Sequence, residues 1–358
     1  MKQNKQARLG DNESKTQASN KTSRSQIVLS GVKPSGELHL GNYLGSLKNF
    51  VELQNKYQCY FFLATYHSIT EDYKPDEKEQ DIFNLALDFL AAGLDPKKCT
   101  IFNQADVPEC TELTWIFNCF TPVSELERMT QFKDKSAKNV KNINAGLLDY
   151  PVLQAADILL YHPGLVPVGY DQLQHLELTN EIVRWFNNKF GQYFLPVKPL
   201  LTNIPKVMSL LEPEKKMSKS SGIGHYIAIN DEPEIIHEKL KRAVTGTGTE
   251  EVIPAGAQNL LALLSEFGTP KQTTYFNEQI KNRTIRYSEL KEILAKDISD
   301  YFADFRKKRK LLEKKPQYVE KVLKEGAKKA QKVAQKTIKE VKVLIGVNSA
   351  EFNLLAQN

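Results

Sequence analysis

Short buried apolar runs alternate with helical patterns from residue 27 to about residue 230. The runs are Ile27-Val28-Leu29, Cys59 to Ala64, Thr100-Ile101-Phe102 and Val166 to Val168. Near-continuous apolar strands that alternate with helices are typical of a parallel sheet covered on both faces. The alternation therefore predicts an α/β fold.

Helical patterns fill the intervals between these runs. From Ile82, apolar residues recur at the spacing of one helix face, and Gly93 stands where a C-cap is expected. A second helical pattern runs from Asp171 to Phe190 and stops at Gly191. From about Pro233 the strand signals vanish, and the chain is expected to be helical through Val347.

This change of pattern gives the predicted domain boundaries. Residues 26–230 are predicted to form the sheet-bearing domain. Residues 231–347 are predicted to form an α-helical domain whose last helices, near 320–347, pack back on the first. Residues 1–25, rich in Lys, Asn, Gln, Ser and Thr, are predicted to be a disordered polar tail, and residues 348–358 a C-terminal tail.

Composition excludes several classes of protein. No run approaches the roughly 18 apolar residues of a transmembrane helix, so no membrane association is expected. Residues 1–24 contain no apolar stretch, which excludes a secretory signal. An organellar transit peptide is disfavoured because Asp11 and Glu13 are acidic and arginine is scarce, so a cytoplasmic location is expected. The four cysteines form no Cys-x-x-Cys pair, and no His/Cys cluster has zinc-ligand spacing, so no metal site is predicted.

Positive charge is concentrated near the C-terminus. The chain carries a net charge of +6, and residues 306–342 contain fifteen Lys or Arg against four Glu. Such a run fits a solvated helix face and a surface for a polyanion equally well. Both interpretations stay open at this point.

A glycine-rich turn follows the first buried strand and precedes a helical pattern from Leu44 to Leu53. A strand-to-helix turn of this kind lets backbone approach a nucleotide and points a helix N-terminus at its phosphate. His39, at the helix start, can donate a hydrogen bond to a phosphoryl oxygen. Alone, the turn is weak evidence. Its sequence is Ser30-Gly31-Val32-Lys33-Pro34-Ser35-Gly36-Glu37-Leu38-His39-Leu40-Gly41-Asn42-Tyr43.

A second motif, Lys216-Met217-Ser218-Lys219-Ser220, is followed by the flexible stretch Ser221-Gly222-Ile223-Gly224. Two lysines three positions apart in a mobile loop can clamp a polyphosphate. Their charge would offset the negative charge that develops on a leaving pyrophosphate. Taken alone, a loop rich in Lys and Ser is more often a solvent-exposed connector.

Together, the two motifs resemble the paired signatures of class I aminoacyl-tRNA synthetases. His39-Leu40-Gly41-Asn42 is similar to the His-Ile-Gly-His signature, and residues 216–220 match the Lys-Met-Ser-Lys-Ser signature letter for letter. Their separation of roughly 175 residues also suits this class. The resemblance extends over roughly residues 27–347. It implies a Rossmann-like parallel-sheet catalytic domain and an α-helical C-terminal domain for anticodon recognition.

Asn42 and three further stretches resemble the tryptophanyl branch of this class. Residues 129–136 are similar to its lysine-bearing insertion, 150–161 to its amino-acid-pocket helix, and 166–175 to its nucleotide-side strand and turn. The activity implied is ATP-dependent ligation of L-tryptophan to tRNA(Trp) through a tryptophanyl-adenylate. Mg²⁺ would accompany the polyphosphate, and a homodimer is expected.

The resemblance also implies roles for individual residues. Asp157 would accept the indole N–H, because a substrate without that donor leaves a buried carboxylate unpaired. Without the resemblance, a local helix cap would be the preferred role for Asp157. The other amino-acid ligands would be Tyr150, Gln154, Gln172 and His67. ATP would be bound by Lys33, Pro34, Ser35, Gly41, Asn42, Gly169, Tyr170, Asp171, Val207, Lys216, Met217, Ser218, Lys219 and Ser220. The catalytic set would be His39, Asn42, Lys133, Lys135, Lys216 and Lys219.

Several positions depart from the family pattern, but none removes a signature lysine, His39 or Asp157, so an active enzyme is expected. Lys33 stands where Gln is commoner, Leu29 where an aromatic residue often packs on the ligand, Tyr170 in place of Glu, Gln154 in place of Met, and Thr65-Tyr66-His67 in place of Asp-Gln-His.

Three other functions stay open. A tyrosyl enzyme has a similar fold and pocket acid, although residues 129–136 and Asn42 argue against it. A small-molecule nucleotidyltransferase shares the first turn but not the complete second motif. A non-catalytic tRNA-binding paralogue would not need the retained His39, Lys216 and Lys219. Amino-acid selectivity, tRNA dependence and adenylate formation discriminate among them.

Overall fold

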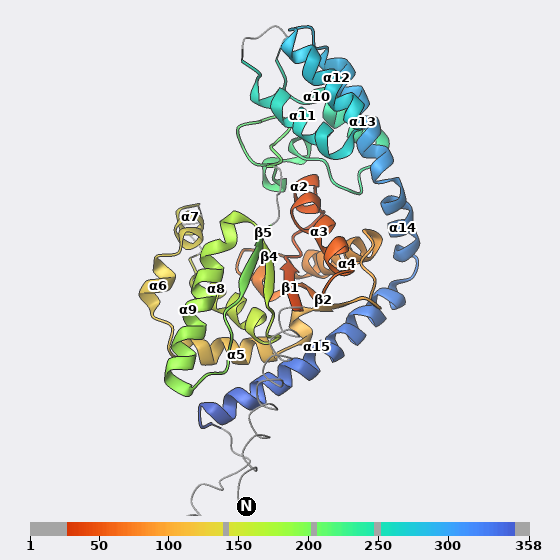
Figure 1. Ribbon diagram of the computed structural model, residues 1–358. Helices are drawn as coiled ribbons and strands as arrows, with labels where there is room; N and C mark the ends of the chain where they lie inside the picture. The colour runs from red at the N-terminus through yellow and green to blue at the C-terminus, as the bar shows by residue number, and fades with distance from the viewer. Residues whose placement is uncertain (1–26, 139–142, 202–205, 247–251, 348–358) are drawn as a thin grey trace, which may run out of the picture.

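The computed structural model describes residues 27–138, 143–201, 206–246 and 252–347 (Figure 1). The predicted tails, 1–25 and 348–358, lie outside these ranges. Within them, no helix is both long enough and apolar enough to cross a membrane.

A parallel sheet forms the centre of the first half of the chain. Its strands lie in the order β3-β2-β1-β4-β5, and every pairing is parallel, which confirms the predicted α/β fold. The last strand was not predicted, because it is short, largely exposed and interrupted by Pro199. The strands are β1 (Ile27–Val32), β2 (Gln58–Leu63), β3 (Cys99–Asn103), β4 (Leu165–Val168) and β5 (Lys198–Leu201).

Helices cover both faces of the sheet, as the apolar strands require. Gly93 and Gly191 follow helices at positive φ, which confirms both predicted helix ends. The helices are α2 (Leu40–Asn42), α3 (Lys48–Leu53), α4 (Pro75–Ala91), α5 (Glu109–Asn118), α6 (Val123–Glu127), α7 (Thr130–Lys138), α8 (Ala145–Leu159) and α9 (Leu173–Phe190). Shorter turns are η1 (Tyr43–Leu47), η2 (Tyr66–Ile69), η3 (Gln104–Asp106), η4 (Tyr170–Gln172), η5 (Lys219–Ser221) and η6 (Ile223–His225).

The two faces of the sheet contribute to two separate apolar cores. Because side chains alternate along a strand, Phe61 of β2 faces one core and Phe62 the other. The core that contains Phe61 includes residues of α3 and α4, whereas the core that contains Phe62 includes residues of α5, α8 and α9.

The chain after β5 is helical. Figure 1 shows α10 to α13 gathered at one end of the molecule, with α14 leading from them to α15, which runs back past the sheet. The bounds are α10 (Pro233–Arg242), α11 (Ala255–Phe267), α12 (Pro270–Lys281), α13 (Tyr287–Tyr301), α14 (Ala303–Glu313) and α15 (Pro316–Leu344).

Helix α15 lies against β3, the edge strand of the sheet, and so protects an edge that would otherwise be open to pairing. A Cβ added at Gly326 would lie 1.7 Å from the carbonyl oxygen of Ile101, so only glycine permits this approach. Farther along, Thr337 Oγ1 donates to the carbonyl oxygen of Leu160 at 2.8 Å. Helix α14 is tied to α4 by the buried pair of Arg309 and Asp88, whose Nε and Oδ1 are 2.8 Å apart.

Candidate active site

A cavity opens where β1 and β4 separate. These strands share one paired position, Val28 with Leu165, and farther on Pro167 has no N–H with which to continue the ladder. The strand order reverses its direction here, and ligands of open α/β sheets bind at such a switch point, beyond the carboxyl ends of the strands. The cavity has a volume of about 290 Å³.

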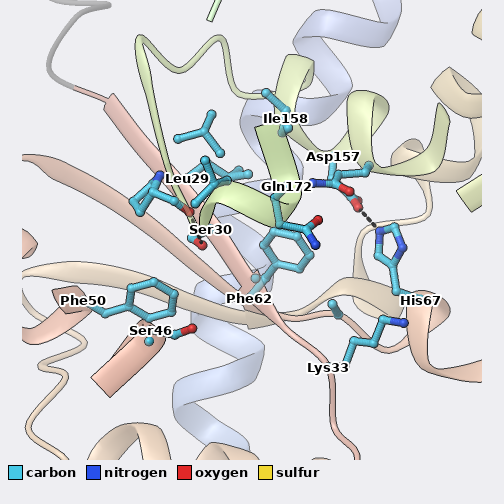
Figure 2. Close-up of a pocket in the computed structure, with 18 of the residues that line it drawn as sticks. Leu29, Ser30, Lys33, Ser46, Phe50, Phe62, His67, Asp157, Ile158 and Gln172 are labelled. Carbon is cyan, nitrogen blue, oxygen red and sulfur yellow. Dashed lines mark hydrogen bonds and ion pairs between the residues drawn. The ribbon is translucent and has the colours of Figure 1, made fainter. Parts of the chain in front are cut away.

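Seven of the predicted site residues line this cavity (Figure 2). They follow β1, β2 and β4 or lie on α8, which explains how positions far apart in sequence meet at one edge of the sheet. The seven are Lys33, His67, Tyr150, Gln154, Asp157, Gly169 and Gln172.

Asp157 is held by side chains from two other elements. It is 3% exposed on α8, and its Oδ2 accepts from Nε2 of His67 at 2.7 Å (Figure 2). Nε2 of Gln104 lies 2.8 Å from each carboxylate oxygen. Because these partners belong to η2 and η3, the interpretation of Asp157 as a local helix cap is wrong. The carboxylate is fixed in place at the cavity wall.

Gln104 was missed by the sequence analysis, although it directly follows β3 at the edge where ligands bind. It is 1% exposed, and its Oε1 accepts from the backbone N–H of Tyr66 at 2.9 Å. That contact fixes the orientation of the amide, so its NH₂ group must face Asp157. The position of Gln104 after a buried strand is the signal that could have identified it.

Tyr150 and Gln172 meet the cavity from α8 and from the turn after β4. The Tyr150 hydroxyl shares a 2.9 Å hydrogen bond with Nε2 of the buried His175, and burial raises the pKa of Tyr150 to about 12. Gln172 Nε2 donates to Asp171 Oδ2 at 3.1 Å. Lys33 Nζ lies 6.0 Å from the centroid of the Tyr150 ring and brings a positive charge to this part of the cavity.

His39 is locked in one tautomer at the start of α2. Its Nδ1 accepts from the backbone N–H of Asn42 at 3.3 Å, while Asn42 Oδ1 accepts from the backbone N–H of His39 at 3.1 Å. Burial, together with the charges of Lys219 and Lys216, lowers the pKa of His39 to about 4. The ring is therefore neutral at pH 7 and carries its proton on Nε2, where it can donate to an anion.

The second motif folds back onto the first. Lys219 Nζ donates to the carbonyl oxygen of Ser35 and lies 3.3 Å from Ser35 Oγ. Burial lowers the pKa of Lys219, although the nearby carboxylates of Asp81, Glu37 and Asp88 oppose that shift. Lys216 is exposed. The two signatures therefore meet, with the ammonium group of Lys219 held against backbone.

The loop that carries the second motif is anchored to residues 207 and 208, which precede it in the chain. The backbone N–H of Met217 donates to the carbonyl oxygen of Val207 at 3.0 Å, and both side chains are buried. A Cβ added at Gly41 would lie 3.7 Å from Cβ of Val207, so Val207 stands beside the His39 helix. Ser218 and Ser220 share a 2.8 Å hydrogen bond between their hydroxyls.

Comparison with known proteins identifies the family. A family model described as class I tRNA synthetases (W and Y) matches residues 21–314. The tryptophan–tRNA ligase of Clostridium tetani is 43% identical over 328 residues, which is 90% of this chain and 96% of that protein. The chain belongs to the tryptophan–tRNA ligase family.

Other members support this assignment. The tryptophan–tRNA ligase of Rickettsia bellii is 43% identical over 90% of this chain and 98% of its own. The tryptophanyl-tRNA synthetase of Campylobacter jejuni, solved with ADP and tryptophan, superimposes with a TM-score of 0.79 at 34% identity, covering 89% of this chain and 99% of that one. A tyrosyl-tRNA synthetase from Archaeoglobus fulgidus has a TM-score of 0.63 at 21% identity, which shows a shared fold only.

Within the tryptophan–tRNA ligase fold, the structure leaves some predicted residues away from the cavity. Tyr170 is 68% exposed on η4, and Asp171 beside it is also exposed. Lys133 is exposed on α7 and does not line the cavity, whereas Gln131 of the same helix does. The side chain of Lys135 lies outside the described residues. Pro34 is buried in the turn after β1.

Proposed function

We propose that the protein ligates L-tryptophan to tRNA(Trp) in two steps. The first forms tryptophanyl-adenylate from tryptophan and ATP with release of pyrophosphate. The second transfers the tryptophanyl group to the 2′-hydroxyl of the terminal tRNA adenosine. The observation that carries the proposal is the Asp157 carboxylate, held by Gln104 and His67 at the wall of a cavity that Lys33 and Gly169 also line.

Asp157 supplies the specificity for tryptophan. The indole of tryptophan has one N–H donor, and a buried carboxylate facing it gains a charge-assisted hydrogen bond. Phenylalanine has no such donor, so its binding would leave the carboxylate without that partner. Tyr150, Gln154 and Gln172, also predicted as amino-acid ligands, line the same cavity, and Tyr150 and Gln172 would hold the substrate ammonium group.

The first step needs no protein nucleophile. The tryptophan carboxylate attacks the α-phosphorus of ATP, the new P–O bond forms, and the bond to pyrophosphate breaks. The enzyme positions the reactants and stabilises the charge that develops. Nε2–H of His39 would donate to a phosphate oxygen, and Lys216 and Lys219 would balance charge on the departing pyrophosphate. The adenosine contacts predicted for Gly169, Tyr170, Asp171 and Val207 belong to this proposal.

Magnesium would enter with the polyphosphate and shield its charge. In the described ranges, no group of three His, Cys, Asp or Glu could hold a metal ion. We propose that Mg²⁺ is held by the phosphate oxygens of ATP, without a dedicated protein site.

The tRNA would be bound by the helical region and by α15. The apolar side chains of α15 face the core, whereas its lysines, such as Lys328 and Lys332, are exposed. An exposed basic stripe of this kind suits the phosphate backbone of tRNA. Anticodon bases would be recognised by α10 to α13, because unstacked bases can be read individually.

A homodimer in the cytoplasm completes the proposal. Trp115 of α5 is 71% exposed and Val123 of α6 is 57% exposed. An apolar patch on a surface marks a place that another protein covers, and we propose that α5 and α6 contribute to such an interface. Sedimentation of the purified protein measures this state directly, and a monomer at micromolar concentration would contradict it.

The proposed activity is tested by amino-acid-dependent exchange of pyrophosphate into ATP. Each of the twenty amino acids is assayed separately, with and without tRNA. We expect exchange with tryptophan alone and without tRNA. Exchange with tyrosine would assign the protein to the tyrosyl activity, and no exchange with any amino acid would favour a tRNA-binding paralogue.

A further inference from the structure

The ring of Phe62 lies over Gly31. The two residues are register partners on β2 and β1 and face the same side of the sheet. A Cβ added at Gly31 would lie 2.5 to 2.8 Å from three atoms of the Phe62 ring. The space that a side chain would take on β1 is therefore filled by the aromatic ring of the neighbouring strand.

The Phe62 ring packs against another aromatic ring and also lines the cavity. Phe102 of β3 stacks on it with a centroid distance of 5.7 Å and an interplanar angle of 26°. Phe62 is 5% exposed and lines the cavity, and Figure 2 shows it among Leu29, His67 and Asp157. Its position is fixed by strand pairing and by the aromatic ring behind it.

The two other phenylalanine or tyrosine rings that line the cavity in the described part of the chain have different surroundings. Phe50 belongs to the core on the opposite face of the sheet and stacks on Phe61 at 4.3 Å. Tyr150 has its hydroxyl committed to His175. Phe62 lines the cavity together with Asp157 and Ile158 of α8, and Phe62 and Ile158 belong to the same apolar core.

We propose that Phe62, seated over Gly31, is the aromatic surface against which the substrate indole packs. This inference rests on the proposed function, because it names a second specificity-determining contact in the same amino-acid site. Asp157 recognises the edge of the indole through its N–H, and Phe62 recognises the ring. Gly31 is required because it leaves room for Phe62 beside the cavity.

The first test replaces Phe62 with leucine. Aromatic pairs contribute up to about tenfold in affinity beyond the area they bury, so F62L should raise KM for tryptophan roughly tenfold in pyrophosphate exchange. KM for ATP should stay unchanged. The matched control is F117L, which alters a fully buried ring of the same core that does not line the cavity. F117L should lower thermal stability without raising KM for tryptophan.

The second test is a double-mutant cycle with the substitutions G31A and F62L. G31A places a methyl group where the ring lies, and it should also raise KM for tryptophan. In the F62L background, the ring atoms that the methyl group meets are gone, so G31A should have little further effect. Equal effects of G31A in both backgrounds would overturn the proposed role of Gly31.

The outcomes separate this inference from the function on which it rests. Absence of tryptophan-dependent exchange in the unaltered protein would overturn the proposed function. Normal exchange in the unaltered protein, with KM for tryptophan unchanged in F62L, would overturn the role of Phe62 alone.

Discussion

The two ends of the active site are built differently. At the amino-acid end, Asp157, His67 and Gln104 are buried and already joined by hydrogen bonds. At the phosphate end, Lys216 is exposed, and Lys219 is bonded to the carbonyl oxygen of Ser35, a contact that a phosphate would replace. The proposed recognition groups are thus already joined to one another, whereas the lysines proposed to balance charge belong to a loop whose present contact a phosphate would replace.

This difference follows from what each end must recognise. A single N–H donor is distinguished best by a rigid, desolvated acceptor, since misplacement would weaken both binding and discrimination. Charge on a departing pyrophosphate develops only during the reaction, so a group that acts there contributes to rate more than to affinity. Variants at the two ends should therefore affect rate and affinity separately.

The largest effect is expected for Lys219→Ala. The variant should slow adenylate formation roughly 10²- to 10³-fold, the loss typical of a group that stabilises developing charge. Tryptophan affinity should change little. Single-turnover kinetics and calorimetry measure the two quantities. Lys215→Ala, which alters an exposed neighbour paired with Glu212, is the matched control. Equal losses of rate and tryptophan affinity would mean that Lys219 acts before the transition state.

The next largest effect is expected for Asp157→Ala. Loss of a hydrogen bond to a charged group should weaken tryptophan binding roughly 10- to 100-fold and leave ATP affinity unchanged. Calorimetric titration with each ligand measures this separation. Asp149→Ala, which alters a carboxylate of the same helix bonded to Asn118, should leave both affinities unchanged. An unaltered tryptophan affinity in the Asp157 variant would show that Asp157 does not contact the bound tryptophan.

A smaller effect is expected for Gln104→Leu. The carboxylate of Asp157 would lose the donor that reaches both of its oxygens but keep His67. Tryptophan affinity should fall by up to roughly tenfold, the value of one net hydrogen bond. Selectivity for tryptophan over phenylalanine should fall with it, whereas ATP affinity should not. Unchanged selectivity would show that Asp157 needs no support from Gln104.

The smallest effect concerns the protonation of His39. Its pKa in the folded protein is about 4, below the 6.5 of an unperturbed imidazole. As pH falls from 6.5 toward 4, the unfolded chain takes up this proton first, so the His39 contribution to stability is lost across that window. Replacing Lys216 and Lys219 with methionine should raise the pKa only in part, because burial is the largest cause of the shift. NMR titration of the imidazole measures it, and an unchanged pKa would exclude coupling to the lysines.

The fold and the meeting of the two motifs could be predicted from the sequence. Apolar strands such as Cys59 to Ala64 have a strong local signal, and residues that follow parallel strands gather at one edge. The edge strand β5 could not be predicted, because Lys198 and Pro199 resemble a loop. The loss of strand signals near Pro233 also predicted where the helical part of the chain begins, and α10 starts at that residue.

The finer contacts depend on tertiary packing that a sequence pattern does not carry. Gln104 looks like an ordinary polar residue after a strand, and its importance comes from the amide geometry that links Tyr66 to Asp157. Phe62 lies in a continuous apolar run in which no periodicity tells which ring faces a cavity. Tyr170 was predicted to bind ATP from its place in a motif, yet its exposure depends on how η4 turns.

We propose that Asp157 receives the indole N–H of tryptophan. It is tested most directly by comparing tryptophan with its benzothiophene analogue, in which sulfur replaces the N–H group. Adenylate formation with each substrate is measured in the unaltered protein and in Asp157→Ala. We expect a preference for tryptophan of roughly tenfold or more in the unaltered protein, and its near-complete loss in the variant. The same preference in both proteins would contradict the claim and assign the recognition of tryptophan to another residue.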